Sequence, residues 1–383
     1  MSTIEDAHQD AATPLALARW SARLDRIVAG LFVLVLCVPG AAIAAGFKPP
    51  PPIENRPVAE VQRWSLGSIF DTDWYASVDA AITDRLVLRS QAIAARGRIE
   101  LATGGTGTVR VLRGTGNWMF FSVDMTTPCA LDVGTVVSSL DKLHDRFAAA
   151  GQRFFVLVGP DKSAIYGDKL PADVALGCTA DNRPAIESAA AARPWLIDAW
   201  HPLLAARTAT PAAGLYFPQD THWTPLGESV AVQPLIDAID PGAWADPAVG
   251  PSGHFTKTMD LAREVGLPVR REVPNIRRGA VAVTRTIVPV PGISHGPFLF
   301  TMHTDAPHVV PGRTLVISDS FLRIDPYVVG AFFADSVWVP REWLDSDPGL
   351  LARLGPFDTV ILSRVERHLY DESFGPLLAR AIR

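Results

Sequence analysis

Three side chains in two short segments have the types that a serine nucleophile requires. Asp220-Thr221-His222-Trp223 places a carboxylate two residues before a histidine, and Asp319-Ser320-Phe321 places a serine just after the strand-like run 314–318. A serine hydroxyl is a poor nucleophile at neutral pH and needs a neighbouring base. The residues therefore predict that Ser320 attacks, His222 takes its proton and Asp220 orients the imidazole. Such triads recur in several chain orders on unrelated folds, so the order Asp–His–Ser is no obstacle.

The elements around these motifs predict a parallel sheet. From about residue 137 the pattern alternates, with helical spacing at 137–150 and 225–239 and continuous apolar runs at 153–159, 314–317, 336–339 and 358–362. Strands alternating with helices predict an α/β fold with a sheet covered on both faces. Ligands bind beyond the carboxyl ends of such strands, and Ser320 lies there. Thr224-Pro225 is a good helix start, so His222 is expected on the loop before helix 225–239.

Each motif also has a plainer explanation. A serine between a strand and a helix is often only an N-cap, a role that Asp319 could also fill. His222 could be a half-buried histidine paired locally with Asp220. Metal binding is a third alternative, but the sequence shows no further His, Asp or Cys cluster at ligand spacing, so we expect no metal or other cofactor.

Charged residues follow two of the predicted strands at the same edge of the sheet. Lys162 comes after the run 153–159, and Arg364, Glu366 and Arg367 come after the last strand. We expect Lys162, Arg364 and Arg367 to line a cleft for a polar substrate. The alternatives are a solvated loop lysine and a salt-bridged helix start.

The amino-terminal region indicates export. Residues 27–47 carry no charge. The length of this run is close to the ~20 residues that cross a bilayer core. Arg19, Arg23 and Arg26 precede this run, and a bias of positive charge favours an inside amino terminus. We therefore expect a cytoplasmic segment 1–26, a transmembrane signal anchor 27–47 and the rest of the chain in the periplasm. The alternative is a cleaved signal peptide, with Ala42-Ile43-Ala44 as the cleavage site.

Cysteine usage agrees with an oxidising compartment. Cys37 lies in the apolar run, which leaves Cys129 and Cys178 as an even pair beside turn residues. We expect a disulfide between them, and two free buried thiols are the alternative.

Composition limits the class of protein. The chain has 383 residues, 48% hydrophobic and 20% charged, as in a globular protein. A formal net charge of -5 and the absence of a basic run argue against a nucleic-acid partner, so we expect none. Residues 48–60 are proline-rich and indicate a stiff spacer, and 80–96 is predicted to be a helix stopped by Gly97. The domain boundaries expected are a spacer and helical segment at 48–100 and one catalytic domain at 101–383.

These residues resemble a known family, the alginate O-acetyltransferases of the bacterial periplasm (the AlgJ/AlgX-like branch of the SGNH hydrolase-like superfamily). The most specific match is the pair Asp220-Thr221-His222-Trp223 and Asp319-Ser320-Phe321, in that order and spacing. The other matching segments are Glu54-Asn55-Arg56, Asp84-Arg85 with Arg89, Gly116-Asn117-Trp118-Met119-Phe120, Pro160-Asp161-Lys162-Ser163-Ala164-Ile165-Tyr166, Pro225-Leu226-Gly227, Met259-Asp260-Leu261 and Val365-Glu366-Arg367.

The resemblance implies an α/β/α sandwich with a mainly parallel central sheet, preceded by one transmembrane helix. It implies acetyl transfer through an acetyl-Ser320 intermediate onto hydroxyls of an exported polysaccharide. The acetyl group would come from a multi-pass membrane O-acyltransferase in the inner membrane. Tyr166 joins Lys162, Arg364 and Arg367 as an expected substrate-binding residue.

The sequence also departs from the family pattern. Ser318 stands where a glycine is common, and Asn117 replaces the usual glycine before Trp118. No residue specifies alginate, so the polymer is left open. A periplasmic carbohydrate acetyl esterase and a non-catalytic polysaccharide-binding assembly subunit are the alternatives.

Overall fold

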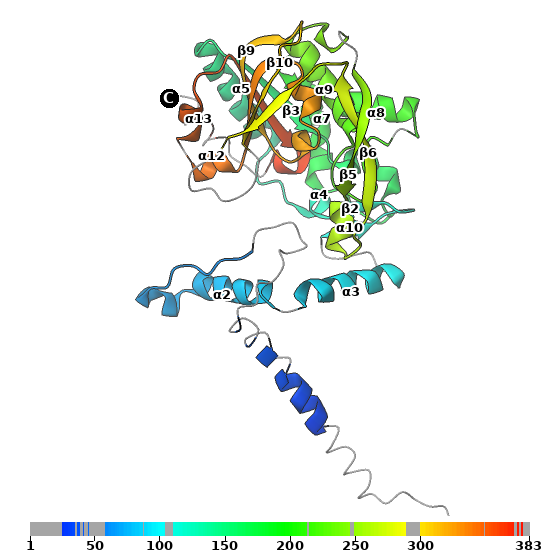
Figure 1. Ribbon diagram of the computed structural model, residues 1–383, viewed down its shortest axis with the longest axis vertical. Coiled ribbons are helices and arrows are strands. Elements are labelled where there is room, and N and C mark those ends of the chain that lie inside the picture. The colour runs from blue at the N-terminus through cyan, green and yellow to red at the C-terminus, as the bar shows by residue number, and fades with distance from the viewer. Residues whose placement is uncertain are drawn as a thin grey trace, which may run out of the picture. The chain divides into compact units, whose positions relative to one another are not determined.

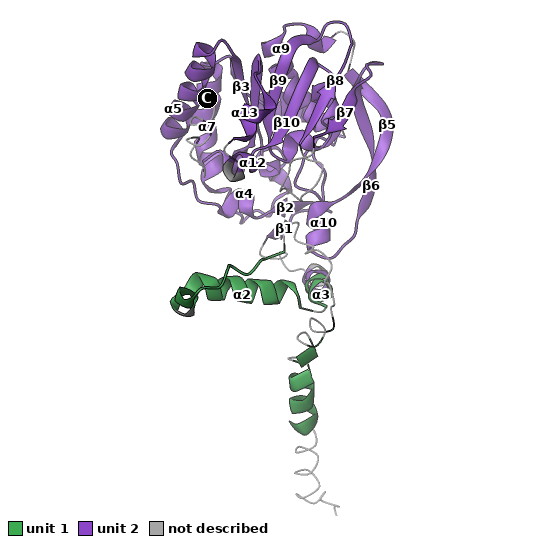
Figure 2. Cartoon of the chain, turned by 60° about the vertical axis from the view of Figure 1, so that its left-hand side comes forward, with its two compact units in different colours: residues 1–94 green, residues 95–383 purple. Residues whose placement is uncertain are grey.

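The computed structural model divides the chain into two compact units, residues 1–94 and residues 95–383 (Figures 1 and 2). It describes residues 25–34, 37–38, 41, 45, 58–86, 88–103, 110–212, 214–245, 249–288, 299–347, 349–370, 374 and 377. The predicted proline-rich spacer lies mostly outside these residues, as does part of the predicted anchor 27–47. No helix in the described part of the chain is long and apolar enough to cross a membrane, so the anchor stays a prediction.

The first unit contains η1 (Leu66–Phe70) and α2 (Thr72–Asp84), and α3 (Arg89–Ala102) spans the boundary between the units. The single predicted helix 80–96 is wrong, because the chain leaves helical geometry between α2 and α3, where Leu88 has a φ of 66°. Gly97 does not stop a helix either. It lies inside α3, where a Cβ would come within 2.6 Å of the carbonyl oxygen of Val265.

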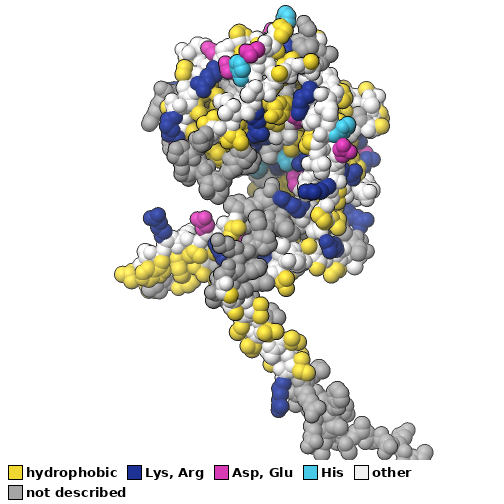
Figure 3. All heavy atoms as spheres, viewed as in Figure 1, with side chains coloured by type: hydrophobic (Ala, Val, Ile, Leu, Met, Phe, Trp, Pro, Cys, Tyr) yellow, Lys and Arg dark blue, Asp and Glu magenta, His cyan; other side chains and the backbone are white. Residues whose placement is uncertain are grey.

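Large apolar side chains are exposed on the first unit. Trp64, Leu66 and Phe70 are 62%, 77% and 90% exposed, and yellow side chains are prominent on the segment before α2 (Figure 3). Asp71 caps α2 by accepting a hydrogen bond from the backbone of Asp73.

The second unit is built on a mixed sheet, which has seven strands in the described part of the chain. The order is β4-β3-β11-β9-β10-β8-β7, and the pairs from β4 to β10 are parallel. The strands are β3 (Arg153–Gly159), β4 (Leu196–Ile197), β7 (Thr284–Ile287), β8 (Phe300–His303), β9 (Val310–Ser318), β10 (Phe333–Pro340) and β11 (Thr359–Val365). The predicted parallel strands are thus confirmed, but β8 and β7 add an antiparallel edge that we did not expect.

Helices cover both faces of the sheet. Helix α5 (Val133–Ala149) packs on α7 (Gly177–Ala191), α9 (Pro225–Ile239) packs on α8 (Trp200–Ala209), and both α5 and α9 contact β3. Successive side chains of a strand point to opposite faces, and all of β3 after Arg153 is buried. The α/β prediction is confirmed.

Short elements complete the second unit. Among the residues that the structure describes, two antiparallel pairs lie outside the main sheet, β1 (Val111–Arg113) with β2 (Met119–Phe121) and β5 (Val249–Thr258) with β6 (Arg270–Arg278). The short helices are α4 (Val123–Thr126), α6 (Lys162–Ile165), η2 (Gly167–Lys169), η3 (Ala243–Ala245), α10 (Asp260–Glu264), η4 (Phe321–Arg323), α11 (Tyr327–Gly330), α12 (Trp343–Ser346), α13 (Leu350–Leu354) and η5 (Glu366–His368).

A disulfide joins Cys129, before α5, to Cys178 in the first turn of α7. The bond links the segment before α5 to α7, and these two helices pack together.

Candidate active site

Ser320 lies at the carboxyl end of β9, directly before η4. Its side chain caps no helix. Asp319 instead accepts from the backbone N–H of Phe321 at 2.9 Å and from that of Val365 at 2.6 Å, which ties this turn to β11. Asp319, and not Ser320, therefore caps this turn. The hydroxyl of Ser320 is left exposed to solvent and free to do chemistry.

His222 lies on a tight loop before α9. Thr224 caps that helix by accepting from the backbone N–H of Gly227 at 3.1 Å. Gly227 lets the loop approach closely, since a Cβ there would come within 2.0 Å of the carbonyl oxygen of Leu215. The loop is closed by a hydrogen bond from the N–H of Phe217 to the carbonyl of His222 at 3.2 Å.

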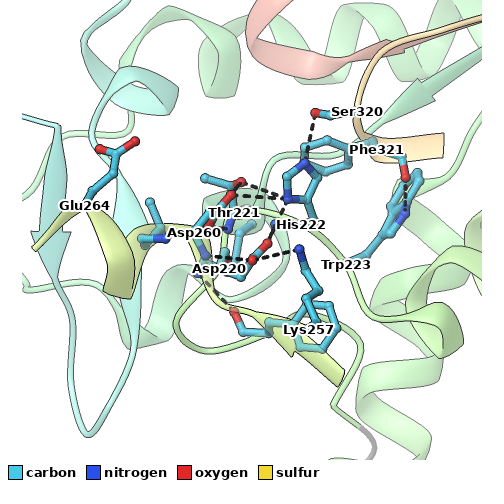
Figure 4. A network of polar contacts seen from close by, with 12 residues as sticks. Asp220, Thr221, His222, Trp223, Lys257, Asp260, Glu264, Ser320 and Phe321 are labelled. Atoms are coloured by element: carbon cyan, nitrogen blue, oxygen red, sulfur yellow. Dashed lines mark hydrogen bonds and ion pairs between the residues drawn. The ribbon is translucent and has the colours of Figure 1, made fainter. Parts of the chain in front are cut away.

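The two loops bring the predicted triad together (Figure 4). His222 Nε2 lies 2.9 Å from Ser320 Oγ, and His222 Nδ1 lies 2.7 Å from Asp220 Oδ1. An ionised carboxylate only accepts hydrogen bonds, so Nδ1 carries the proton and Nε2 presents its lone pair to Ser320. This is the arrangement of a general base beside a serine nucleophile.

The electrostatics favour an ionised Asp220. Burial opposes ionisation, but the hydrogen bond and charge of His222 and the ammonium of Lys257 hold the pKa of Asp220 well below its ordinary value. Lys257 Nζ lies 3.0 Å from Asp220 Oδ2, and that oxygen also accepts from the backbone N–H of Asp260 at 2.9 Å. Asp220 is therefore fixed at both oxygens.

His222 has a second carboxylate beside it. This carboxylate is Asp260, the first residue of α10, and its Oδ2 lies 3.3 Å from His222 Nδ1. Burial opposes protonation of the imidazole, but Asp220 and Asp260 together raise the pKa of His222 above its ordinary value. Sequence analysis assigned no role to Asp260, and the signal present was its place in the matching segment Met259-Asp260-Leu261.

Asp220, His222 and Asp260 also form a group with the composition of a metal site, with donor atoms within 4.8 Å of one another. Sequence analysis found no such cluster because Asp260 is distant along the chain. In this structure the oxygens face N–H and O–H donors, including Lys257 and the hydroxyl of Thr221. The two carboxylates therefore hold the imidazole of His222 in place.

The four side chains expected in a substrate cleft are buried in the structure, and each is engaged by other groups of the protein. Lys162 Nζ donates to the carbonyls of Phe217, Pro218 and Asp220, and the hydroxyl of Tyr166 accepts from the backbone N–H of Leu215. Arg367 pairs with Asp124 and Asp161, and Arg364 donates to the carbonyl of His368. Charges taken out of water must be paired. The loops at this edge fold inward, and these side chains hold them in place.

The sequence of residues 111–267 matches the family model described as SGNH hydrolase-like domain, acetyltransferase AlgX. This segment is therefore similar to the AlgX acetyltransferase family. The resemblance seen in the motifs and the expectation of an acetyltransferase of this class are confirmed by that match. It covers Asp220, His222 and Asp260 and ends before Ser320. No curated protein matches the chain.

Similar chains are also found among solved structures. The O-acetyltransferase domain of Pseudomonas putida AlgJ is 15% identical with a TM-score of 0.46, covering 71% of this chain and 98% of that one. Bacillus cereus PatB1 with a sulfonyl adduct is 15% identical with a TM-score of 0.48, covering 68% and 98%. Pseudomonas aeruginosa AlgX is 14% identical with a TM-score of 0.38, covering 71% and 66%.

Proposed function

We propose that this protein is an O-acetyltransferase that moves an acetyl group, through an acetyl-Ser320 intermediate, onto hydroxyls of an exported polysaccharide. The observation that carries the proposal is the continuous chain from Ser320 Oγ through His222 to Asp220. The family match supports acetyl transfer as its chemistry.

In the first half-reaction, Ser320 Oγ attacks the carbonyl carbon of an acetyl donor while His222 Nε2 takes the hydroxyl proton. The imidazolium that forms is stabilised by the carboxylates at Nδ1. The tetrahedral intermediate then collapses, the bond from the acetyl carbon to the leaving group breaks, and His222 returns the proton to that group. The product is acetyl-Ser320 and a neutral His222.

In the second half-reaction, His222 Nε2 removes the proton of a sugar hydroxyl, whose oxygen attacks the acetyl carbon. The second tetrahedral intermediate expels Ser320 Oγ, and His222 protonates it. The acetyl ester now lies on the acceptor, and the enzyme is restored. The same residues serve both halves because His222 regains its proton state after each one.

Intact-mass analysis of the full chain after incubation with a chromogenic acetyl ester tests the intermediate. We expect wild type to gain about 42 Da, one acetyl group, and Ser320→Ala to gain nothing. Loss of a triad residue typically costs ~10⁴-fold in rate, so Ser320→Ala and His222→Ala should abolish turnover and Asp220→Ala should cut it severely. Near-normal turnover in folded Ser320→Ala would end the proposal.

Mass analysis of an added oligosaccharide then separates transfer from hydrolysis. Acetylated oligosaccharide supports the transferase. Free acetate as the sole product indicates the esterase, since water then reaches the acyl-enzyme. Polymer binding with no adduct and unchanged acetylation in Ser320→Ala indicates a non-catalytic assembly subunit.

We further propose that the catalytic unit works in the periplasm, with its acetyl group supplied by a multi-pass membrane O-acyltransferase. The uncharged run 27–47 after three arginines and the Cys129–Cys178 disulfide support export. Protease treatment of spheroplasts should degrade residues 48–383 and leave the cytoplasmic segment 1–26 intact. Protection of the whole chain would contradict this location, and recovery of the acyltransferase by crosslinking would test the partner.

A further inference from the structure

We infer that Asp260 is a second carboxylate that positions His222 for both proton transfers, a role that rests on the function proposed above. The imidazole is then held by a carboxylate pair. Asp220 lies 2.7 Å and Asp260 lies 3.3 Å from the same nitrogen, Nδ1 (Figure 4).

The position of Asp260 is rigid. Its Oδ1 accepts from the backbone N–H of Thr221 at 2.8 Å and from that of Leu261 at 2.6 Å, and its Oδ2 accepts from the Thr221 hydroxyl at 2.5 Å. The Thr221 hydroxyl oxygen lies 3.1 Å from His222 Nδ1. Because that hydroxyl donates to Asp260, its oxygen is left to accept from Nδ1. Asp260 therefore acts on the imidazole both directly and through Thr221.

The two carboxylates also hold each other. The backbone N–H of Asp260 donates to Asp220 Oδ2 at 2.9 Å, while the side chain of the same residue lies beside the imidazole. A change at α10 is thus transmitted to Asp220 as well as to His222. One short helix thus fixes both carboxylates beside Nδ1.

Charge gives a reason for the pair. Asp220 and Asp260 both have pKa values held below the ordinary range, so both are ionised at neutral pH. Lys257 supplies one positive charge at Asp220. Together Asp220, Asp260 and Lys257 carry one net negative charge, which favours the protonated His222 that forms as Ser320 attacks. The ammonium of Lys162 is also near and donates to the backbone carbonyl of Asp220 at 2.7 Å, so it opposes part of this effect.

Two substitutions in the full chain should have opposite effects on the imidazole. Asp260→Asn keeps the size of the side chain and removes its charge, so the pKa of His222 should fall. Lys257→Met removes the positive charge, so the pKa of His222 should rise. NMR titration of the imidazole measures both shifts with no substrate present. A role confined to supporting the loop would not give shifts of opposite sign.

The kinetic test uses turnover of the chromogenic acetyl ester. Loss of one hydrogen bond to a charged group predicts that Asp260→Asn lowers kcat/KM by about 10- to 100-fold, with the lower limb of its pH profile moved to lower pH. Asp220→Asn should lose more. Since each carboxylate partly replaces the other, the loss in the double variant should exceed the product of the two single losses.

Asp305→Asn is the matched control, because Asp305 is exposed and lies 3.0 Å from His303, away from the triad. It should change neither the pKa of His222 nor turnover. An Asp260→Asn protein that folds normally and keeps the wild-type pKa of His222 would overturn the inference. Failure of the proposed function would show differently, as an absence of acetyl-Ser320 in wild type with the two opposite pKa shifts intact.

Discussion

The indole Nε1 of Trp223 donates a 2.9 Å hydrogen bond to the backbone carbonyl of Phe321. These residues directly follow the base His222 and the nucleophile Ser320. Their rings also meet edge to face, with centroids 5.1 Å apart. The bond therefore joins the two loops of the triad and sets the separation of base and nucleophile.

Trp223→Phe tests this link. The ring packing is largely kept, but the carbonyl of Phe321 loses the indole donor and keeps only the longer 3.4 Å contact from the backbone N–H of Ile324, which should cost about 1–3 kcal/mol of unfolding free energy. We expect kcat to fall more than KM rises, because the Ser320–His222 distance is no longer fixed. Urea unfolding and steady-state kinetics measure the two effects. An unchanged kcat would show that the link does not position the triad.

The pH dependence of turnover should report His222. A neutral imidazole is needed to take the serine proton, so kcat/KM should rise with pH and level off above the raised pKa of His222, above the ordinary 6.5. Because the pKa of His222 is raised in the folded state, the protonated imidazole stabilises the fold fully below pH 6.5. This contribution to stability is lost as the pH rises through the raised pKa. His303→Gln, at an exposed histidine, should leave the profile unchanged. A midpoint below 6.5 in wild type would contradict the assignment.

Lys162 should make the stability of the fold rise with pH in the alkaline range. Burial, opposed by Asp260, Asp220 and Asp124, lowers its pKa to about 8. The unfolded chain then binds more protons than the folded one between about 8 and 10.5, so this residue's contribution to stability rises with pH over that window. Lys162→Met should lack the rise and lose turnover, because the carbonyls of Phe217, Pro218 and Asp220 lose the ammonium that holds them together. Lys169→Met, at a partly exposed lysine, is the control. If stability changes equally with pH in wild type and Lys162→Met, the prediction for Lys162 is wrong.

Glu228, on α9, should weaken the fold as pH rises. Burial and the nearby Asp325 raise its pKa well above 4.5, so the protonated form is favoured in the folded state. Its contribution to stability is full below 4.5 and is lost as pH rises through the raised value. Glu228→Gln keeps an acceptor for the backbone N–H of Asp325, which lies 3.1 Å from Oε2. The variant should unfold at higher urea than wild type at pH 8 and not at pH 4. Glu272→Gln, at an exposed residue of β6, should match wild type at both pH values.

Loss of the disulfide should destabilise the second unit. Cys129 and Cys178 are separated by 49 residues, and removing a bond of this kind typically costs about 2–5 kcal/mol. The Cys129→Ala/Cys178→Ala variant should therefore unfold at lower urea concentration than wild type, and dithiothreitol should lower wild type towards it. Dithiothreitol should not affect the variant. Identical unfolding midpoints would mean that the bond is absent from the purified protein.

Much of the sheet could be predicted from sequence. The run 153–159 became β3 and the stretch 225–239 became α9, each with the predicted bounds. A strand buried on both faces must be apolar throughout, and a helix start needs a cap, so both leave local signals. Strand β7 is exposed along its whole length and has no apolar pattern, which is why the antiparallel edge was missed.

The sequence by itself determined which residue types can do the chemistry, because Ser320, His222 and Asp220 lie next to recognisable strand and helix boundaries. Tertiary structure alone decided that Asp260 and Lys257 join them, since these residues meet the triad only when α10 and β5 pack against the loop before α9. It also decided that Lys162 and Arg367 serve the scaffold. A charged residue looks the same in sequence whether it faces substrate or a buried partner, and only packing distinguishes the two.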